Sequence, residues 1–170
     1  KTLEFKENTS SPLRIIKTVV AFANTAGGTI VIGIEDKTRK VVGIPHILLE
    51  EERMANLISD LISPMLMPDI DIISHTGKEL LLIHVPHNPG PFYLKKSGIN
   101  RGVFVRLGSS NRLADPETLA NLQRLAKRIS FDEMACVSAG VNALNKTLLH
   151  KKLKTSFKNL SEKHYQSLGL

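Results

Sequence analysis

Two acidic side chains, Glu4 and Asp36, stand beside segments of the chain that are expected to be β-strands. Residues 2–6 alternate apolar and polar side chains, which predicts a short strand with Glu4 on its polar face. Asp36 follows a β-branched run at residues 29–34, which is typical of a buried strand. If the two strands are neighbours, the carboxylates converge and can hold Mg²⁺ or Mn²⁺ through oxygen ligands. Such a cation would activate water against a phosphodiester.

A structural role is the alternative for these two acids. Lys6 lies two residues after Glu4, and Lys37 lies directly after Asp36, so each acid has a basic residue close to it in the sequence. Ion pairs between such neighbours would leave two ordinary carboxylates at strand edges and no metal centre. The sequence leaves both interpretations open, because it does not establish that the two acids are neighbours.

A group of basic residues in the second half of the chain offers a different chemistry. Arg106 lies on the strand predicted for residues 103–107, and Arg112 follows a Gly-Ser-Ser-Asn turn at residues 108–111. Backbone N–H groups and hydroxyls of such a turn can hold phosphate, and an arginine fork matches phosphate geometry. The alternative is a charged edge that prevents strand-to-strand aggregation. The predicted nucleic-acid-binding residues are Lys95, Lys96, Arg101, Arg106 and Arg112.

The formal net charge of +7 over 170 residues is unevenly distributed. Residues 1–94 carry a net charge of −2, residues 95–128 carry +6, and residues 146–170 carry +5. Segregated basic charge favours a polyanionic partner, and a solubilising surface is the alternative. The chain has no Trp and only 5% aromatic residues, which makes base stacking a poor candidate for the main contact. We therefore expect backbone contacts with low sequence specificity and strong salt dependence.

One stretch, residues 18–36, is expected to position these groups. It predicts the end of a helix, a chain reversal at Gly27 and Gly28, and a buried strand. The two glycines follow a helix instead of preceding one, and the chain has no GxxxxGK[ST] motif, so a turn is favoured over a phosphate loop. Residues 41–44 are predicted to return as the second strand of a hairpin across residues 37–40.

The remaining segments alternate between helices and strands. Helices are predicted for residues 13–23 and 48–62 and from Asp115 onward, strands for residues 69–73, 79–85 and 103–107, a short edge segment for residues 92–94, and a polar loop for residues 95–102. This order predicts an α+β fold, in which packed helices cover a mixed, largely antiparallel sheet of about five or six strands. A small C-terminal helical appendage follows.

Three segments of the chain resemble a known domain family. Residues 21–36, with the sequence AFANTAGGTIVIGIED, are similar to the central segment of the Schlafen AlbA-type domain, also called the divergent-AAA domain. Residues 3–6, LEFK, resemble the opening "EFK" strand of that family. Residues 103–111, VFVRLGSSN, resemble its late "YxRxGSSN" segment. The three segments follow one another in the expected order, and the resemblance covers residues 3–128.

The resemblance implies a function together with two alternatives. Bacterial-style members of the family are described as DNA-binding transcriptional regulators, which implies a nucleic-acid-binding domain with DNA as a better partner than RNA. The Schlafen ribonucleases use three acids, of which Glu4 and Asp36 match two, while the third position falls upstream of Lys1. The incomplete triad makes a metal-dependent ribonuclease the second choice. The divergent-AAA name suggests an ATP-binding module, but the sequence has no Walker-type motif.

Cofactors and compartment follow from the same observations. No cofactor is expected for a nucleic-acid-binding domain, and Mg²⁺ or Mn²⁺ is expected only if Glu4 and Asp36 form a nuclease site. The single Cys136 excludes an internal disulfide and fits a reducing, cytoplasmic compartment. No stretch approaches the ~20 apolar residues that span a bilayer.

The chain is expected to hold one domain and part of a second region. We expect residues 1–128 to form the Schlafen AlbA-like domain. Residues 129–170 are expected to form the helical appendage or the start of a longer C-terminal region, with helices at residues 148–157 and 161–168. A protein-interaction or oligomerisation module, such as a homodimer, is a further alternative to nucleic-acid binding.

Overall fold

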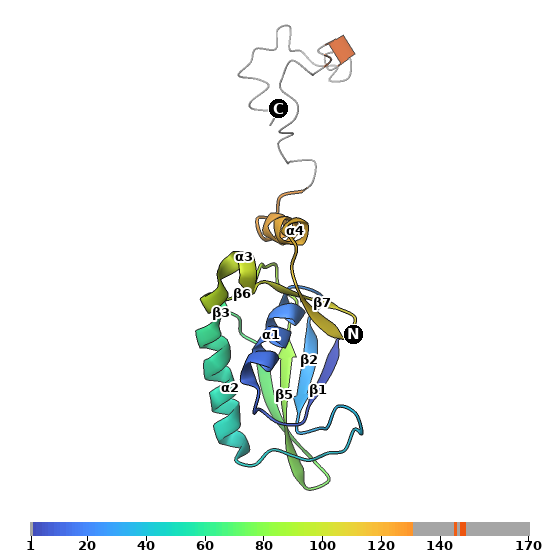
Figure 1. Ribbon diagram of the computed structural model, residues 1–170, viewed down its shortest axis with the longest axis vertical. Helices are drawn as coiled ribbons and strands as arrows, with labels where there is room; N and C mark the ends of the chain where they lie inside the picture. Colours follow the sequence, from blue (N-terminus) through green and yellow to red (C-terminus); the bar gives the residue numbers. More distant parts are fainter. Residues whose placement is uncertain (1, 131–144, 146, 149–170) are drawn as a thin grey trace, which may run out of the picture. The chain divides into compact units, whose positions relative to one another are not determined.

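The computed structural model describes residues 2–130, 145, 147 and 148 (Figure 1). One compact unit comprises Lys1–Lys127. Its main sheet has the strand order β1-β2-β5-β4, with β1 at Leu3–Lys6, β2 at Gly28–Ile32, β5 at Lys78–Val85 and β4 at Asp69–His75. Strands β1 and β2 are parallel, whereas β2–β5 and β5–β4 are antiparallel pairs. The predicted α+β class with a mixed sheet is confirmed.

The connection from helix α1 (Pro12–Ala23) to β2 depends on two glycines. Gly27 has a φ of +70°, and its N–H donates a hydrogen bond to the Phe22 carbonyl at the end of the helix, at 2.9 Å. A Cβ atom on Gly28 would lie 2.7 Å from the Thr2 carbonyl oxygen and 2.8 Å from the Phe22 ring. The pair therefore closes the helix and lets β1 approach β2, as the predicted turn requires.

The hydrophobic core lies between one face of the main sheet and two helices, α1 and α2 (Ile47–Leu61). Ile16 from α1 and Ile58 from α2 join Ile30 of β2 and Ile83 of β5 in one buried cluster. Ile30 and Ile83 are register partners and therefore point to the same face of the sheet. Burial of side chains of this size contributes about 1.5–3 kcal/mol each, so this face fixes where β1 and β2 stand.

The segment between β2 and α2 differs from the sequence prediction. The second hairpin strand predicted for residues 41–44 is wrong, because the structure has only a single bridge between Ile34 and Val41. Gly33 and Gly43 have φ values of +104° and +79°, so both leave the extended conformation that a strand requires. The guanidinium carbon of Arg39 lies 4.3 Å from the centre of the Phe5 ring, which places this segment against β1.

Two small sheets complete the unit. Strand β3 (Ile62–Ser63) pairs with β6 (Tyr93–Leu94), and β7 (Phe104–Leu107) pairs with β8 (Ser110–Leu113). The strands predicted for one sheet are thus divided among three.

The segments that flank β7 also differ from the prediction. The polar loop predicted for residues 95–102 is helical and forms the 3-10 turn η1 (Lys95–Ser97) and the short helix α3 (Gly98–Gly102). These two turns are too short to produce a readable helical periodicity. The predicted turn at residues 108–111 is shorter than expected, because Ser110 and Asn111 already belong to β8.

Helix α4 (Pro116–Ala126) follows the hairpin as predicted. The Asp115 carboxylate caps it by accepting a hydrogen bond from the Thr118 N–H at 2.7 Å. Among the described residues, none of the helices has the length and apolar character of a membrane-crossing segment. Apart from Leu148, the helices predicted at residues 148–157 and 161–168 lie outside the described residues, and the division into domains at residue 128 stays a prediction.

Candidate functional site

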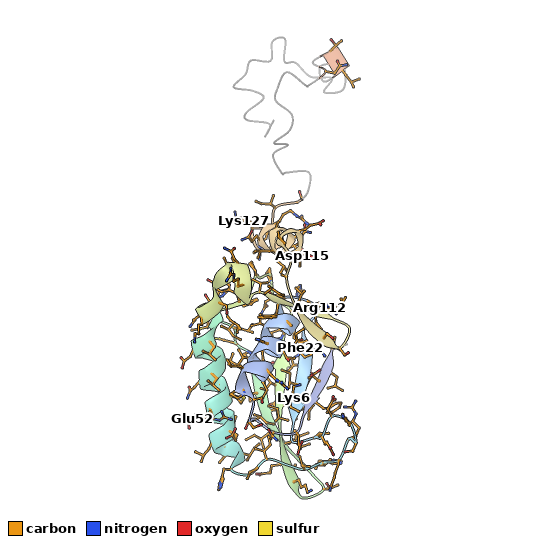
Figure 2. All side chains as sticks on the ribbon, viewed as in Figure 1. Lys6, Phe22, Glu52, Arg112, Asp115 and Lys127 are labelled. Carbon is orange, nitrogen blue, oxygen red and sulfur yellow. The ribbon has the colours of Figure 1, made fainter. Side chains whose placement is uncertain are left out.

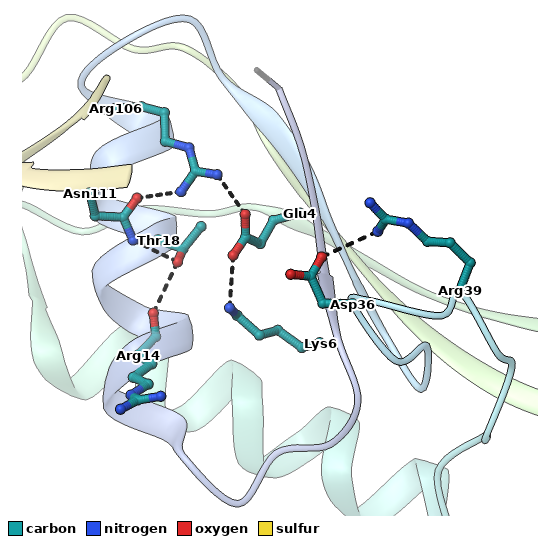
Figure 3. Close-up of polar contacts among 8 residues, drawn as sticks. All are labelled: Glu4, Lys6, Arg14, Thr18, Asp36, Arg39, Arg106 and Asn111. Atoms are coloured by element: carbon teal, nitrogen blue, oxygen red, sulfur yellow. Dashed lines mark hydrogen bonds and ion pairs between the residues drawn. The ribbon is translucent and has the colours of Figure 1, made fainter. Parts of the chain in front are cut away.

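A buried ion pair between Arg106 and Glu4 lies at the centre of the polar contacts around the β7–β8 hairpin (Figure 3). Nη2 of Arg106 donates to Oε2 of Glu4 at 2.5 Å, and Nη1 donates to Oδ1 of Asn111 at 2.7 Å. The side chain of Arg106 is only 4% exposed and that of Glu4 is 16% exposed. Oε1 of Glu4 accepts a hydrogen bond from Nζ of Lys6 at 2.7 Å. Both carboxylate oxygens therefore have a cationic partner.

The surroundings of Glu4 lower the pKa of its carboxyl below the ordinary value of 4.5. Burial alone would raise this pKa, because it disfavours the charged form. The hydrogen bonds donated by Lys6 and Arg106, together with the positive charges of both side chains, outweigh that burial. Glu4 is therefore an ionised, fully partnered carboxylate at neutral pH.

Two threonines on and after α1 extend this network. Nδ2 of Asn111 donates to the hydroxyl of Thr18, which is buried in the middle of the helix, at 2.9 Å. The backbone N–H of Arg106 donates to the hydroxyl of Thr25 at 2.9 Å. One face of the hairpin is thereby held against α1 and the residues that follow it, by a side chain of β8 and a backbone N–H of β7.

Asn24, at the C-terminal end of α1, holds the start of the hairpin in place. Its Nδ2 donates to the carbonyls of Phe92 and Phe104 at 2.8 and 3.0 Å, and its Oδ1 accepts from the Phe92 N–H at 2.8 Å. The side chain is buried, so these three bonds satisfy backbone groups that water does not reach. This role of Asn24 was not predicted from the sequence, where the only signal was a polar residue between a helix and a glycine pair.

The structure changes the role assigned to Arg106. The sequence correctly places it on the face of β7 opposite Val105 and Leu107, but Leu107 is 66% exposed, so the arginine is on the inner face. Its guanidinium carbon lies 5.3 Å from the centre of the Phe22 ring, inside the unit. Arg106 is therefore a buried residue whose guanidinium is paired with Glu4 and Asn111, and its role in phosphate binding stays a prediction.

The two acids that were candidate metal ligands have different cationic partners. Glu4 is paired with Lys6, as the structural alternative expected, and also with Arg106, which that alternative did not include. Asp36 is exposed and pairs with Arg39 at 3.2 Å, not with Lys37 as that alternative expected. Within the described part of the chain, no group of three or more His, Cys, Asp or Glu side chains is arranged to hold a metal ion. The catalytic and metal-binding roles of Glu4 and Asp36 stay predictions.

The other four predicted nucleic-acid-binding residues lie at the surface. Lys95 and Lys96 belong to η1, Arg101 to α3 and Arg112 to β8, and all four are exposed. Arg112 is paired in register with Val105, so it stands on the outer face of the hairpin, opposite the face that carries Arg106. Figure 2 labels Arg112 on this hairpin, which α3 and α4 flank in the chain.

Further cations at this part of the surface were not assigned from the sequence. Lys17 on α1 is exposed, and its Nζ lies 5.2 Å from the centre of the Phe104 ring of β7. Lys127 is exposed directly after α4 (Figure 2). The spacing of Arg14 and Lys17 on the polar side of a predicted amphipathic helix was the available signal for α1.

Charge is segregated between two parts of the unit. Residues 95–127 contain seven basic and two acidic side chains, whereas residues 46–79 contain two basic and seven acidic ones. The first segment forms η1, α3, the hairpin and α4, and the second forms α2, β3, β4 and the start of β5. Since Arg106 is neutralised by Glu4, the positive field around the hairpin comes from the exposed cations.

The family model described as Schlafen, AlbA_2 matches residues 1–115 of the chain. The chain belongs to this family. An uncharacterised protein of Ureaplasma parvum, named as an ATP-binding protein, is 26% identical over 141 residues, which are 78% of the chain and 40% of the relative. The chain thus spans less than half of the length of this curated relative.

Two solved structures have a similar fold. The DIP2311 protein of Corynebacterium diphtheriae is 24% identical, with a TM-score of 0.59 over 94% of this chain and 34% of the other. The N-terminal domain of a RecG-related protein of Nitrosomonas europaea, whose name refers to ATP-dependent DNA helicases, is 26% identical, with a TM-score of 0.51. The match covers 65% of this chain and 81% of that domain.

Substitution of Arg106 and of Arg112 should change the free energy of unfolding by different amounts, because only Arg106 is buried. Arg106→Ala should lower the free energy of unfolding by about 1.5–3 kcal/mol, because it removes the buried guanidinium that donates hydrogen bonds to Glu4 and Asn111. Arg112→Ala, on the opposite face of the same hairpin, should change it by no more than about 0.5 kcal/mol. Urea denaturation followed by circular dichroism measures both values. Equal losses for the two variants would contradict the assignment.

The lowered pKa of Glu4 predicts a dependence of stability on pH. Because the folded pKa lies below 4.5, the ionised carboxylate contributes stability that is present above the unfolded pKa and lost as the pH falls through the folded pKa. The stability curves of the wild type and Glu4→Gln should therefore differ at neutral pH and converge in acid. The exposed Glu7→Gln serves as the control and should follow the wild-type curve. Parallel curves for Glu4→Gln would argue against this role.

Proposed function

We propose that this domain binds nucleic acid, with DNA as the preferred partner, mainly through contacts to the phosphate backbone. The observation that carries the proposal is the set of exposed cations around the β7–β8 hairpin, in a segment, residues 95–127, that has seven basic and only two acidic side chains. Segregated positive charge attracts polyanions and releases their counterions on binding. Lysine and arginine contacts to phosphate position a protein without reading sequence.

The hairpin has the properties of a rigid support for such contacts. Its inner face is held by the Arg106–Glu4 ion pair and by the hydrogen bonds to Thr18 and Thr25. Its outer face presents Arg112, and the exposed Ser109 and Ser110 hydroxyls lie next to the turn. A side chain on a rigid element loses less freedom on binding than one on a mobile loop.

The comparisons support a role in nucleic-acid metabolism and leave a second activity weakly supported. The name of the Nitrosomonas neighbour refers to a DNA helicase, and the family resemblance favours regulators of transcription. We propose that the domain serves as the DNA-binding part of a longer protein of this kind. Metal-dependent ribonuclease activity has less support, because a cation at Glu4 would have to replace both Lys6 and Arg106.

Salt-dependent binding tests the proposal. Fluorescence anisotropy with labelled duplex DNA and with a labelled stem-loop RNA, between about 50 and 200 mM salt, should show binding that weakens steeply with salt. Duplexes of unrelated sequence should bind with similar affinity, because backbone contacts carry no sequence information. No binding to either nucleic acid at low salt would overturn the proposal.

A charge-matched pair of double variants locates the interface. Arg101→Ala with Arg112→Ala should reduce the slope of log affinity against log salt by about 2, one for each lost phosphate contact. Lys37→Ala with Lys40→Ala also removes two exposed positive charges, but from the segment between β2 and α2, and should leave the slope nearly unchanged. Equal effects of the two double variants would show attraction by net charge alone. Cleavage of RNA that requires Mn²⁺ and is lost in Asp36→Ala would instead favour the ribonuclease.

A further inference from the structure

Strand β4 is an exposed edge of the main sheet. It spans Asp69–His75 and pairs with β5 on one side, and among the described residues no strand pairs with its outer side. Six of its seven residues are exposed, including Ile72 at 36% and Ile73 at 41%. Proteins usually protect such an edge with lysine, proline or a bulge, because its unpaired backbone groups bind other strands. Strand β4 contains neither lysine nor proline, and its charged side chains are Asp69 and Asp71.

The surface beside this edge is apolar. Leu48 and Leu49, at the start of α2, are exposed and line a groove of about 430 Å³ together with Ile72. Met65 and Met67, in the segment that leads into β4, are exposed as well. An exposed strand edge flanked by large apolar side chains has the composition of a protein-binding surface.

The residues of β4 are complementary to a second copy of the same strand. In a two-fold antiparallel pairing that continues the sheet, paired residues lie on the same face. One residue of the strand must therefore face its own copy, and the axis passes midway between these two copies. An axis at Asp71 would place two copies of that carboxylate opposite each other, and an axis at Ile70 would pair Asp69 with Asp71. An axis at Ile72 uses all seven residues and places no acids opposite each other. Its pairs are Asp69 with His75, Ile70 with Ser74, Asp71 with Ile73, and Ile72 with itself.

We propose that the chain forms a homodimer in which two β4 strands pair antiparallel about an axis at Ile72. The dimer has one continuous eight-stranded sheet, and one Asp69–His75 pair lies at each end of the two paired β4 strands. The acidic character of residues 46–79 disfavours a polyanion at this edge, so the dimer interface and the cations around the hairpin are separate surfaces. The proposal therefore does not depend on nucleic-acid binding.

A cysteine at the axis tests both the dimer and its register. In a Cys136→Ser background, which removes the single native cysteine, Ile72→Cys should form an intermolecular disulfide on mild oxidation. The two Cβ atoms of a pair directly opposite each other are about 4.5–5.5 Å apart, close to disulfide geometry. Leu125→Cys, an exposed leucine on α4, is the matched control and should remain uncrosslinked. Crosslinking at Ile73→Cys instead of Ile72→Cys would overturn the proposed register.

A charged substitution at the axis tests the interface without a covalent crosslink. Sedimentation velocity at high micromolar concentration should show the wild type as a dimer and Ile72→Lys as a monomer, because two ammonium groups would meet at the axis. Leu125→Lys should remain a dimer. A monomeric wild type, or a dimer that persists in Ile72→Lys, would overturn the proposal. Circular dichroism should show that both variants are folded, since Ile72 and Leu125 are exposed in the monomer.

Discussion

The Glu4–Arg106 ion pair connects the two ends of the folded unit. It joins side chains that are 102 residues apart in the sequence, from the first strand and from the late hairpin. A buried ion pair gains stability only when both charges are matched and the remaining hydrogen-bonding atoms are satisfied. Lys6 supplies an additional partner for Glu4 and Asn111 one for Nη1 of Arg106, while Nε of Arg106 has no hydrogen-bond partner. Removal of Glu4 would therefore leave a buried guanidinium without its counter-charge.

The alternation of side chains along the hairpin separates stability from surface chemistry. Arg106 and Asn111 point inward and hold the hairpin against α1, while Arg112 and Leu107 point outward. Two arginines only six residues apart therefore lie on opposite faces of the hairpin, one buried and one exposed. The same alternation applies to β4, where Ile70 and Ile72 share one face and Asp69 and Asp71 share the other. This strand carries acidic side chains, whereas the hairpin carries basic ones.

Local patterns predicted the elements that carry their own signals. Helix α1 with its glycine turn, the two strands β4 and β5 and the start of the last helix at Asp115 were all expected from periodicity and helix-start rules. The bent segment at residues 33–43 was not, because β-branched residues suggested a strand while two glycines took positive φ values.

The candidate site was the least predictable part. The sequence assigned Glu4 to a metal and Arg106 to phosphate, each on good chemical grounds. The structure shows that the two groups neutralise each other. No local rule predicts such a pair, since the sequence gives residue types and spacing but not the distance between strands that are far apart along the chain. The surface position of the other four basic residues was predictable, because charged side chains without a buried partner lie outside the core. All four are exposed in the structure.

The span of the Glu4–Arg106 pair has a consequence for how the protein is made. Synthesis proceeds from the N-terminus, so β1, α1 and β2 leave the ribosome well before the hairpin exists. During that interval the acid on β1 and the Phe22 ring lack the guanidinium that later covers them. Contacts of such long sequence separation also slow folding, because a large loop must close first. The nascent domain therefore reaches its final packing only after residue 111 has emerged, and it is most exposed to proteases and chaperones before that point.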